Sequence, residues 1–331
     1  MFSIVIPTYN RIDSLKKCLD SIDKQTFDRS KFEVIVVDDG SEKDVAKMLS
    51  LCKYSFKLFT IRIDHAGPAQ ARNIGAKHAI NNYIIFFEDD IVVDNSYLEV
   101  AYNILCEGKY DVVEGKTMLS GRKREIRHFD EENVFSFIPC NLIIRRELFV
   151  KLGGYDTNFF DFESGLYFRE DADLGFRLLE IGALMLKTDK LIVEHPEQFT
   201  DISLCFRHSR RYFFDPLLYK KHPKLYRKYI EKKRILGIIL CRPIHKISWM
   251  ALLDYFFICF SLLQNLYYLA DISFFTLLII SSILQIKYMG ISLKSIMGFI
   301  PRLIPFCFLP IVYFFSLVKG CVKFKSYGCL F

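Results

Sequence analysis

The chain has 331 residues, enough for one large domain or two modest ones, and 51% of them are hydrophobic, a high share for a soluble protein. Its ten cysteines form no CxxC pair and lack zinc-finger spacing, so we expect reduced thiols facing the cytosol. The net charge of +7 is concentrated locally, because residues 207–246 hold 13 Lys and Arg against two acids. That band adjoins an apolar region and contains no recognisable nucleic-acid module, so we expect no nucleic acid partner.

The first 90 residues predict alternating strands and helices. Apolar runs typical of strands are FSIVIP, FEVIVV, FKLFTIRID and NYIIFF, and the segments between them have helical spacing: SLKKCLDSIDKQ, KDVAKMLSLC and GPAQARNIGAKHAI. The opening MFSIVIPTYNR has no basic start and no long apolar core, so we expect a strand and a turn there, not a signal peptide. Strands buried on both faces and separated by helices predict a mostly parallel α/β sheet, which binds ligands at the carboxyl ends of its strands.

Acidic residues follow two of these predicted strands. Asp38 and Asp39 end the second strand, and Glu88, Asp89 and Asp90 end the fourth. Adjacent carboxylates repel each other, so their burial requires a positive partner. No GxGxxG follows the first strand and no GxxxxGK[ST] occurs, which leaves dinucleotide and P-loop sites unsupported. We therefore expect a divalent cation that carries the phosphates of a nucleotide, with a solvated acidic loop as the alternative.

Six motifs occur in a characteristic order along the chain. They are SIVIPTYNR, VIVVDDGS, GPAQARNIGAKHA, FFEDD, PCNLIIRRELFVKLGGYD and REDADLGFRLLEIG. In this order and at this spacing they resemble a family 2 glycosyltransferase of the GT-A type, over roughly residues 2–212. The resemblance implies a GT-A fold, with a mostly parallel central sheet, that binds a nucleotide-diphosphate sugar. It does not extend to the last third of the chain.

The resemblance implies roles for residues of the first half. Side chains implied to contact the donor nucleotide are Pro7, Thr8, Tyr9, Asp39, Arg72 and Asp89. Asp90 is implied to be the most direct ligand of Mg²⁺ or Mn²⁺. Residue 88 is Glu where many members have Asp, and the longer side chain leaves its metal role open. From the residues alone, Asp39 could simply open a turn and Arg72 could be a surface helix residue, although the Gly67-Pro68 break makes a helix N-terminus that suits phosphate.

A predicted helix in the second half begins with three acids. Glu170, Asp171 and Asp173 start the segment REDADLGFRLLEIG, where acids are also common helix caps. The residues do not say which acid faces a substrate, and the family pattern selects Asp171 as the catalytic base. Glu170 is a candidate acceptor or diphosphate contact.

Three further residues carry weaker signals. His195 follows a short strand; a lone His is usually structural, but the resemblance implies a metal or diphosphate contact. RHSRRYFF partially resembles the QxxRW motif of processive members, without its Gln and Trp. Arg210 and Arg211 are therefore candidate contacts for a diphosphate or a lipid phosphate.

The expected reaction is an inverting glycosyl transfer. A sugar would move from a UDP- or GDP-sugar to an acceptor hydroxyl, with Asp171 as the base, in one displacement. We expect a lipid-linked glycan or polyprenyl phosphate as acceptor, in cell-surface glycan or glycoprotein biosynthesis. One alternative is a catalytically inactive nucleotide-binding membrane scaffold, which predicts loss of an acid in the DXD or ED motif. Another is a nucleotidyltransferase, which would carry a Gly-rich basic loop where PTYNRIDS stands.

The composition changes twice along the chain. We expect a catalytic domain over 1–215, with a nucleotide-sugar half at 1–90 and an acceptor half at 91–215. Residues 216–248 predict a basic amphipathic juxtamembrane segment, in which Leu225, Tyr226, Tyr229 and Ile230 share a helical face. Residues 249–331 predict a hydrophobic membrane region.

Apolar stretches in that last region cover 249–270, 272–289 and 303–318. The third is short for a crossing and contains Pro305 and Pro310. Lys and Arg flank the region on both ends and lie between the second and third stretches, which favours a hairpin turning near Asp271 followed by a re-entrant or interfacial segment. Three full crossings are the alternative. The catalytic domain is expected on the cytoplasmic side of the membrane.

Overall fold

A computed structural model describes residues 1–120, 137, 139–196, 201–231, 234–235, 238–239, 243–289 and 299–330. The chain divides into two compact units, Met1–Glu197 and Gln198–Phe331. The first unit ends before residue 215, where we placed the end of the catalytic domain. The predicted limits of the catalytic, juxtamembrane and membrane regions remain predictions.

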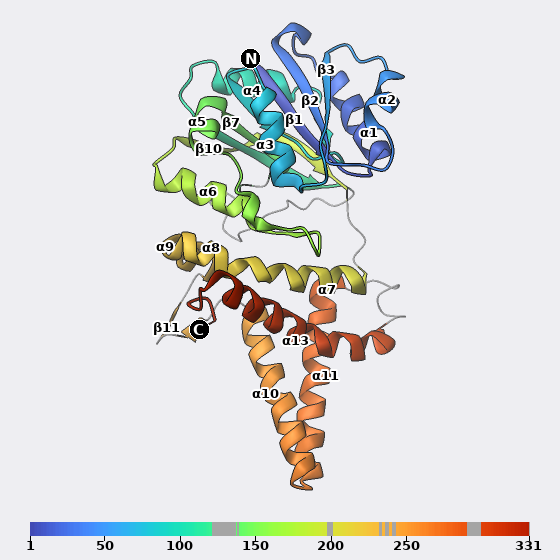
Figure 1. Cartoon of the computed structure of the whole chain (residues 1–331), viewed down its shortest axis with the longest axis vertical. Coiled ribbons are helices and arrows are strands. Elements are labelled where there is room, and N and C mark those ends of the chain that lie inside the picture. The colour runs from blue at the N-terminus through green and yellow to red at the C-terminus, as the bar shows by residue number, and fades with distance from the viewer. Residues whose placement is uncertain are drawn as a thin grey trace. The chain divides into compact units, whose positions relative to one another are not determined.

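An eight-stranded sheet forms the centre of the first unit (Figure 1), in the order β3-β2-β1-β4-β7-β6-β10-β5. Its strands are β1 (Phe2–Thr8), β2 (Phe32–Asp38), β3 (Lys57–Arg62), β4 (Tyr83–Phe86), β5 (Val92–Val93), β6 (Val112–Leu119), β7 (Leu142–Arg145) and β10 (Met185–His195). Neighbours pair in parallel except around β7 and at β5, where the pairing is antiparallel. The predicted mostly parallel α/β fold is confirmed, and β8 (Phe160–Asp161) and β9 (Leu166–Tyr167) add a small hairpin.

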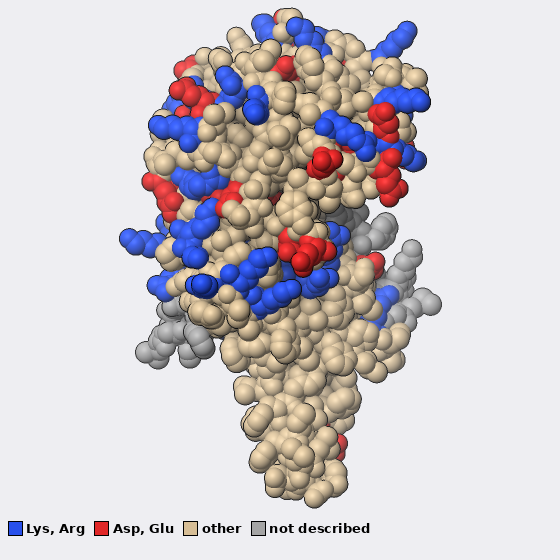
Figure 2. Space-filling model, in the orientation of Figure 1, with Lys and Arg blue, Asp and Glu red and all other residues tan. Residues whose placement is uncertain are grey.

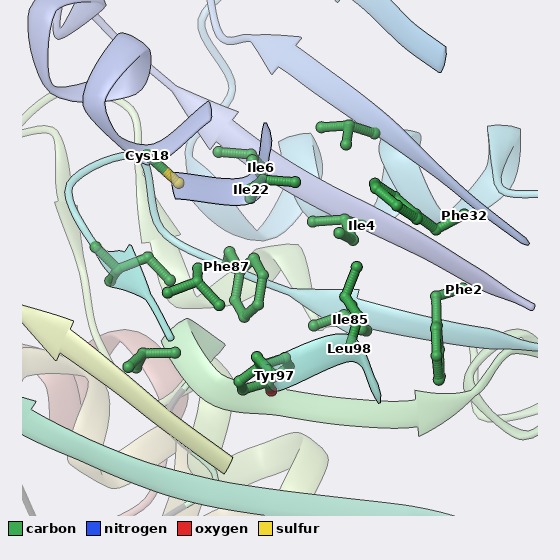
Figure 3. Packing of buried hydrophobic residues seen from close by; sticks show 14 of the residues in the cluster. Phe2, Ile4, Ile6, Cys18, Ile22, Phe32, Ile85, Phe87, Tyr97 and Leu98 are labelled. Atoms are coloured by element: carbon green, nitrogen blue, oxygen red, sulfur yellow. The ribbon is translucent and has the colours of Figure 1, made fainter. Parts of the chain in front are cut away.

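Helices cover both faces of this sheet. They are α1 (Ile12–Asp23), α2 (Val45–Ser50), α3 (Pro68–His78), α4 (Tyr97–Leu105), α5 (Arg146–Lys151) and α6 (Glu170–Glu180), with short 3₁₀ turns η1 (Arg29–Lys31), η2 (Pro139–Asn141) and η3 (Thr157–Phe159). Because side chains alternate along a strand, Phe2, Ile4 and Ile6 of β1 reach the core beneath α1, α2 and α4 (Figure 3). Val5 reaches the opposite core, with residues of α3, α5 and α6. The sheet thus lies between two helical layers, although its edge strand β3 is largely exposed and not buried on both faces as expected.

The strand order reverses between β1 and β4. The chain runs from β1 outward through β2 to β3, then returns to place β4 on the other side of β1. Loops after neighbouring strands diverge at such a switch point, and α/β proteins bind ligands there. Here Thr8, at the end of β1, contacts the loop after β4 that holds the Glu88–Asp90 acids: Thr8 Oγ1 donates to Asp89 Oδ2 at 2.8 Å.

The second unit is helical. Its elements are α7 (Ile202–Arg210), η4 (Arg211–Phe214), α8 (Asp215–Lys221), α9 (Pro223–Leu225), the π-helical turn η5 (Tyr226–Glu231), the strand pair β11 (Arg234–Ile235) and β12 (Ile238–Ile239), α10 (Pro243–Leu263), α11 (Tyr267–Met289) and α13 (Phe299–Phe324). Three of these helices are long and apolar enough to cross a membrane: His245–Leu263, Tyr267–Ile286 and Phe299–Phe324. On the face drawn in Figure 2, the end formed by α10 and α11 shows no Lys or Arg and only one small acidic spot near its tip.

Three details of this unit differ from the expectations. The α10–α11 turn lies at 264–266 and not near Asp271, because Asn265 adopts a left-handed conformation (φ 55°) that ends a helix. α13 continues through Pro305 and Pro310 and is longer than the predicted 303–318. Residues 223–231 form two short helical turns instead of one amphipathic helix, and Tyr226 is buried, with its hydroxyl donating to Asp215 Oδ2 at 3.1 Å. Residues 232–233, 236–237 and 240–242 of the basic band lie outside the described residues.

A buried amide links three parts of the first unit. Asn141 accepts a hydrogen bond from the Tyr97 hydroxyl of α4 at 2.6 Å. Its amide nitrogen donates to the carbonyls of Lys116 in β6 and Leu191 in β10, both at 3.1 Å. Buried polar groups that lose such partners destabilise the fold by more than the bond itself contributed.

We therefore expect Asn141→Ala to destabilise the first unit by about 2–4 kcal/mol, since one hydroxyl and two carbonyls lose their partner. The midpoint of thermal unfolding of the detergent-purified chain should fall by roughly 5 °C or more. Asn103→Ala, at an exposed position of α4, is the matched control and should shift it by little. Equal midpoints for the two variants would contradict the structural role of Asn141.

Candidate functional site

The acids after β4 have a positive partner in Arg11. Asp89 and Asp90 are nearly buried, with side chains 5% and 3% exposed. Arg11 Nη1 lies 3.0 Å from Asp89 Oδ1, and Arg11 Nη2 lies 2.6 Å from Asp90 Oδ2. Arg11 was not among the site residues predicted from the sequence. The only sequence signal was its place directly after PTYN, beside the loop that the resemblance assigned to the nucleotide.

Two acids and one histidine form a cluster with metal-site geometry. His195 ends β10, and its Nε2 lies 3.2 Å from Glu88 Oε2 and 3.4 Å from Asp90 Oδ1. One ligand atom from each residue can be chosen so that all lie within 4.8 Å of one another. Asp90 Oδ1 is buried and has no hydrogen-bond partner, and two carboxylates with an imidazole suit a divalent cation. The cluster fits a metal ion, and it includes Glu88, whose role the sequence left open.

The orientation of the His195 ring favours this use. Its Nδ1 lies 2.9 Å from the carbonyl of Pro196, which leaves Nε2 directed at the acids. A ligating histidine commonly donates its other ring nitrogen to a carbonyl in this way.

The local charges shift three pKa values. Burial alone would lower the pKa of His195, but the hydrogen bond to Glu88 and the charges of Asp90 and Glu88 raise it to about 9. Burial would raise the pKa of Glu88, yet His195 and Arg72 hold it below its ordinary value. Burial raises the pKa of Asp89 to about 6 despite the opposing effect of Arg11. These shifts leave Glu88 ionised and the His195 imidazole protonated near neutral pH.

Arg72 lies buried beside this cluster. Its guanidinium is 3.5 Å from Glu88 and 3.9 Å from Glu170, and it lies over the Tyr155 ring at 5.5 Å. Nε and Nη1 of Arg72 are buried without a hydrogen-bond partner. Because leaving buried donors unpaired is costly, the guanidinium is suited to an anionic ligand such as a phosphate.

The predicted nucleoside-binding residues lie at the ends of β1 and β2. Asp39 accepts hydrogen bonds from the backbone of Ala66 and Gly67, at 2.8 and 3.0 Å, and its Oδ2 lies 3.0 Å from the His65 ring. The Tyr9 ring stacks on His65, with centroids 4.3 Å apart. Tyr9 is 44% exposed, so its outer face is open to a flat ligand.

The other residues of that edge have structural partners. Asp38 accepts from the Ser41 backbone and from Arg62, which fits the turn interpretation of DDGS. Pro7 is paired with Val37 within the sheet. The roles of Pro7, Thr8, Tyr9 and Asp39 in nucleoside binding remain predictions.

Burial distinguishes the three acids at the start of α6. Asp173 is fully buried and bonded to Arg177, at 2.8 and 2.9 Å. Glu170 is 5% exposed and faces Arg72. Asp171 is the partly exposed member, which favours it as the acid that meets a substrate. Arg210 and Arg211 belong to the second unit, and their phosphate contacts and the acceptor contact of Glu170 remain predictions.

The raised pKa of His195 gives the cluster a testable pH dependence. The imidazole is protonated at pH 7, and an ion that takes Nε2 must displace that proton. Affinity should therefore rise by up to about tenfold per pH unit from pH 7 toward the pKa near 9, then level off above it.

The measurement is calorimetric titration with Mn²⁺ as the probe, in two buffers of different ionisation enthalpy. About one proton should be released per ion at pH 7. His195→Gln should bind more weakly and release none. An affinity of the wild-type chain that does not change between pH 7 and 8.5 would exclude Nε2 as a ligand.

Several known proteins resemble parts of this chain. An uncharacterized glycosyltransferase of Rickettsia felis is 33% identical over 108 residues, which is 33% of this chain and 18% of that protein. A poly(ribitol-phosphate) beta-glucosyltransferase of Bacillus spizizenii is 33% identical over 135 residues, covering 40% of this chain and 21% of that protein. The chain thus spans about a fifth of the length of these relatives. An uncharacterized glycosyltransferase of Haemophilus influenzae is 30% identical over 200 residues, covering 54% of this chain and 62% of that protein.

Solved structures show the same fold. The crystal structure of Staphylococcus aureus TarS residues 1–349 in complex with UDP aligns with a TM-score of 0.52 at 18% identity, covering 95% of this chain and 91% of that one. The family model described as glycosyl transferase family 2 matches residues 3–173, more than half of the sequence. This region contains β1, the β1–β4 switch point and the start of α6. The chain belongs to glycosyltransferase family 2.

Proposed function

We propose that this protein is an inverting glycosyltransferase that moves a sugar from a nucleotide-diphosphate sugar to an acceptor hydroxyl. The observation that carries the proposal is the convergence of the Glu88, Asp90 and His195 cluster with Arg72 at the β1–β4 switch point. The unpaired Asp90 Oδ1 and the unpaired donors of Arg72 are complementary to a cation and a phosphate. Family membership supports the reaction class, and the TarS structures solved with UDP and UDP-GlcNAc support a uridine nucleotide as the first donor to test.

Each residue of the site has a separate role in the proposed reaction. Tyr9, with its exposed ring face, packs against the base, and Arg72 donates to the diphosphate. Glu88, Asp90 and His195 would hold Mg²⁺ or Mn²⁺, which would neutralise charge on the departing nucleoside diphosphate. Asp171 takes the proton of the acceptor hydroxyl. The acceptor oxygen bonds to the anomeric carbon as the bond from that carbon to the diphosphate oxygen breaks, so one displacement inverts the configuration.

The second unit supports a membrane-bound enzyme. α10 and α11 form an antiparallel hairpin, and 21 residues of helix span about 30 Å, the thickness of a hydrocarbon core. Large apolar side chains exposed on it include Leu253, Phe256, Phe257, Phe260, Phe274, Phe275 and Ile279. Exposure of so many aromatic and aliphatic side chains is explained by contact with lipid.

The third apolar helix has different surroundings. α13 packs against α10 and α11, and it also packs along α7, η4 and α8, where Gly320 approaches the Phe213 carbonyl so closely that a Cβ would lie 2.0 Å from it. The exposed surface of α7 to η5 carries a basic collar: Arg207, Arg210, Lys220, Lys221, Lys224, Arg227 and Lys228. Moving one such charge to the bilayer centre costs roughly 3 kcal/mol. α13 therefore lies at the headgroup level with the collar, and only α10 and α11 cross.

An acceptor held at the membrane is consistent with this arrangement. Anionic lipid headgroups attract the basic collar, which by the positive-inside rule lies on the cytoplasmic side together with the catalytic domain. We propose a lipid-linked glycan or polyprenyl phosphate as the acceptor. Two relatives named as poly(ribitol-phosphate) transferases support a phosphate-containing glycan polymer as the growing product.

The function is tested by screening the purified chain against a panel of UDP- and GDP-sugars, with release of the nucleoside diphosphate as the readout. Turnover should require Mg²⁺ or Mn²⁺ and be lost in EDTA and in Asp90→Ala. The anomeric configuration of the product, read from its proton couplings by NMR, should be opposite to that of the donor. Retention of configuration would refute the single displacement.

We expect Asp171→Asn to lower the rate by at least roughly 10²-fold while donor affinity changes little, because the amide keeps the size of the side chain but accepts no proton. Donor affinity is measured by titration with the nucleoside diphosphate. Glu180→Gln, at the exposed far end of α6, is the matched control. If Asp171→Asn instead weakens donor binding, and this accounts for the lower rate, then Asp171 is a structural helix cap and not the base.

The arrangement of α13 predicts two crossings. A reporter fused after Leu330 should lie on the same side of the membrane as the N-terminal catalytic domain. A single cysteine introduced at Asn265, in the α10–α11 turn, should react from the opposite side with an impermeant maleimide when the other cysteines are replaced by serine. A C-terminal reporter on the far side would show three crossings.

A further inference from the structure

Arg11 is held in place by the loops that follow β1 and β2. Asn10, directly before it, has a left-handed backbone (φ 56°). The Asn10 N–H donates to Ser41 Oγ at 2.9 Å, and its side-chain oxygen accepts from the Glu42 backbone at 2.8 Å. The chain therefore enters α1 from an anchored turn, with the Arg11 side chain directed toward the loop after β4.

The Arg11 guanidinium determines how the oxygens of Asp89 and Asp90 are used. Both carboxylate oxygens of Asp89 already accept a hydrogen bond, Oδ1 from Arg11 and Oδ2 from Thr8. Asp90 gives Oδ2 to Arg11, while Oδ1 faces His195 and has no hydrogen bond. The fork of Arg11 thus leaves both oxygens of Asp89 hydrogen-bonded and directs Asp90 Oδ1, which accepts no hydrogen bond, toward His195.

We propose that Arg11 is the positioning residue of the cation site: by binding Asp89 and Asp90 together, it turns Asp90 Oδ1 toward Glu88 and His195. The proposal rests on the cation site of the proposed function. Groups that hydrogen-bond a ligating carboxylate orient it, and their loss typically weakens metal binding 10–100-fold.

A competing effect has the opposite sign. Arg11 is positively charged and repels an incoming cation, so its removal alone would tighten binding. Water screens this repulsion, because the Arg11 side chain is 46% exposed, whereas the Asp90 side chain that it orients is 3% exposed. The orienting contact is direct and lies at a nearly buried carboxylate, so orientation outweighs repulsion.

The two effects are separated by measuring the dissociation constant for Mn²⁺ in the full-length chain, by calorimetry and by the loss of the free Mn²⁺ signal in electron paramagnetic resonance. Arg11→Ala should raise it by about tenfold or more. Arg11→Lys keeps the charge but has no planar fork to contact two carboxylates, so it should also raise the constant several-fold. Unchanged thermal unfolding of either variant ensures that the comparison concerns folded protein.

Arg62→Ala is the matched control. Arg62 is 51% exposed and pairs with the buried Asp38 at the end of the neighbouring strand β2, 3.1 Å away, and it touches none of the three acids after β4. The dissociation constant of the Arg62→Ala chain for Mn²⁺ should stay within about twofold of that of the wild type. An Arg11→Ala chain that binds Mn²⁺ as tightly as, or more tightly than, the wild type overturns the positioning role alone. A wild-type chain that binds no Mn²⁺ overturns the cation site itself and the positioning role with it.

Discussion

Three consecutive carboxylates after β4 impose the main electrostatic constraint on the first unit. Isolated charges are not stable in a protein interior, so each acid must be paired where it is buried. The fold supplies the pairs from three separate elements: Arg11 after β1, Arg72 on α3 and His195 at the end of β10. The strand order that places β4 beside β1, and the parallel direction of β10, are what bring these cations to one edge of the sheet.

The same pairing leaves some buried polar atoms of the site without a hydrogen-bond partner. Of the six oxygens in Glu88, Asp89 and Asp90, the buried Oδ1 of Asp90 lacks a hydrogen bond, and Arg72 has two buried donors in the same state. A site that served only to neutralise its own charges would have no reason to retain such atoms, because each is costly. Their signs match a cation and an anionic ligand, which is the combination that a nucleotide diphosphate and its metal ion present.

β1, β2 and β4 could be predicted because each is a nearly continuous apolar run, whereas β3, with the sequence KLFTIR, mixes apolar and polar residues as an exposed edge strand does. The pairing of Arg11 with Asp89 and Asp90 could not be predicted, because 78 and 79 residues separate the partners and no local pattern records the contact. The residues alone did not distinguish Glu170, Asp171 and Asp173, since a helix start offers the same role to all three, and their different burial follows from the packing of α6. The turn after α10 could have been predicted from the polar pair Gln264-Asn265. It was missed because the apolar stretch continues beyond this pair to Ala270.

The order in which the site residues leave the ribosome follows from their positions in the chain. Arg11 and Asp90 both belong to the first 90 residues and can pair once β1 and β4 have formed. His195 emerges about a hundred residues later and completes the cluster only when β10 joins β6. Within residues 1–90 all three acids therefore already have a positive partner, Arg11 for Asp89 and Asp90 and Arg72 for Glu88, yet the cluster of Glu88, Asp90 and His195 is complete only when β10 is in place. A chain that stopped after the nucleotide half would therefore keep the paired acids but lack the histidine of the proposed cation site.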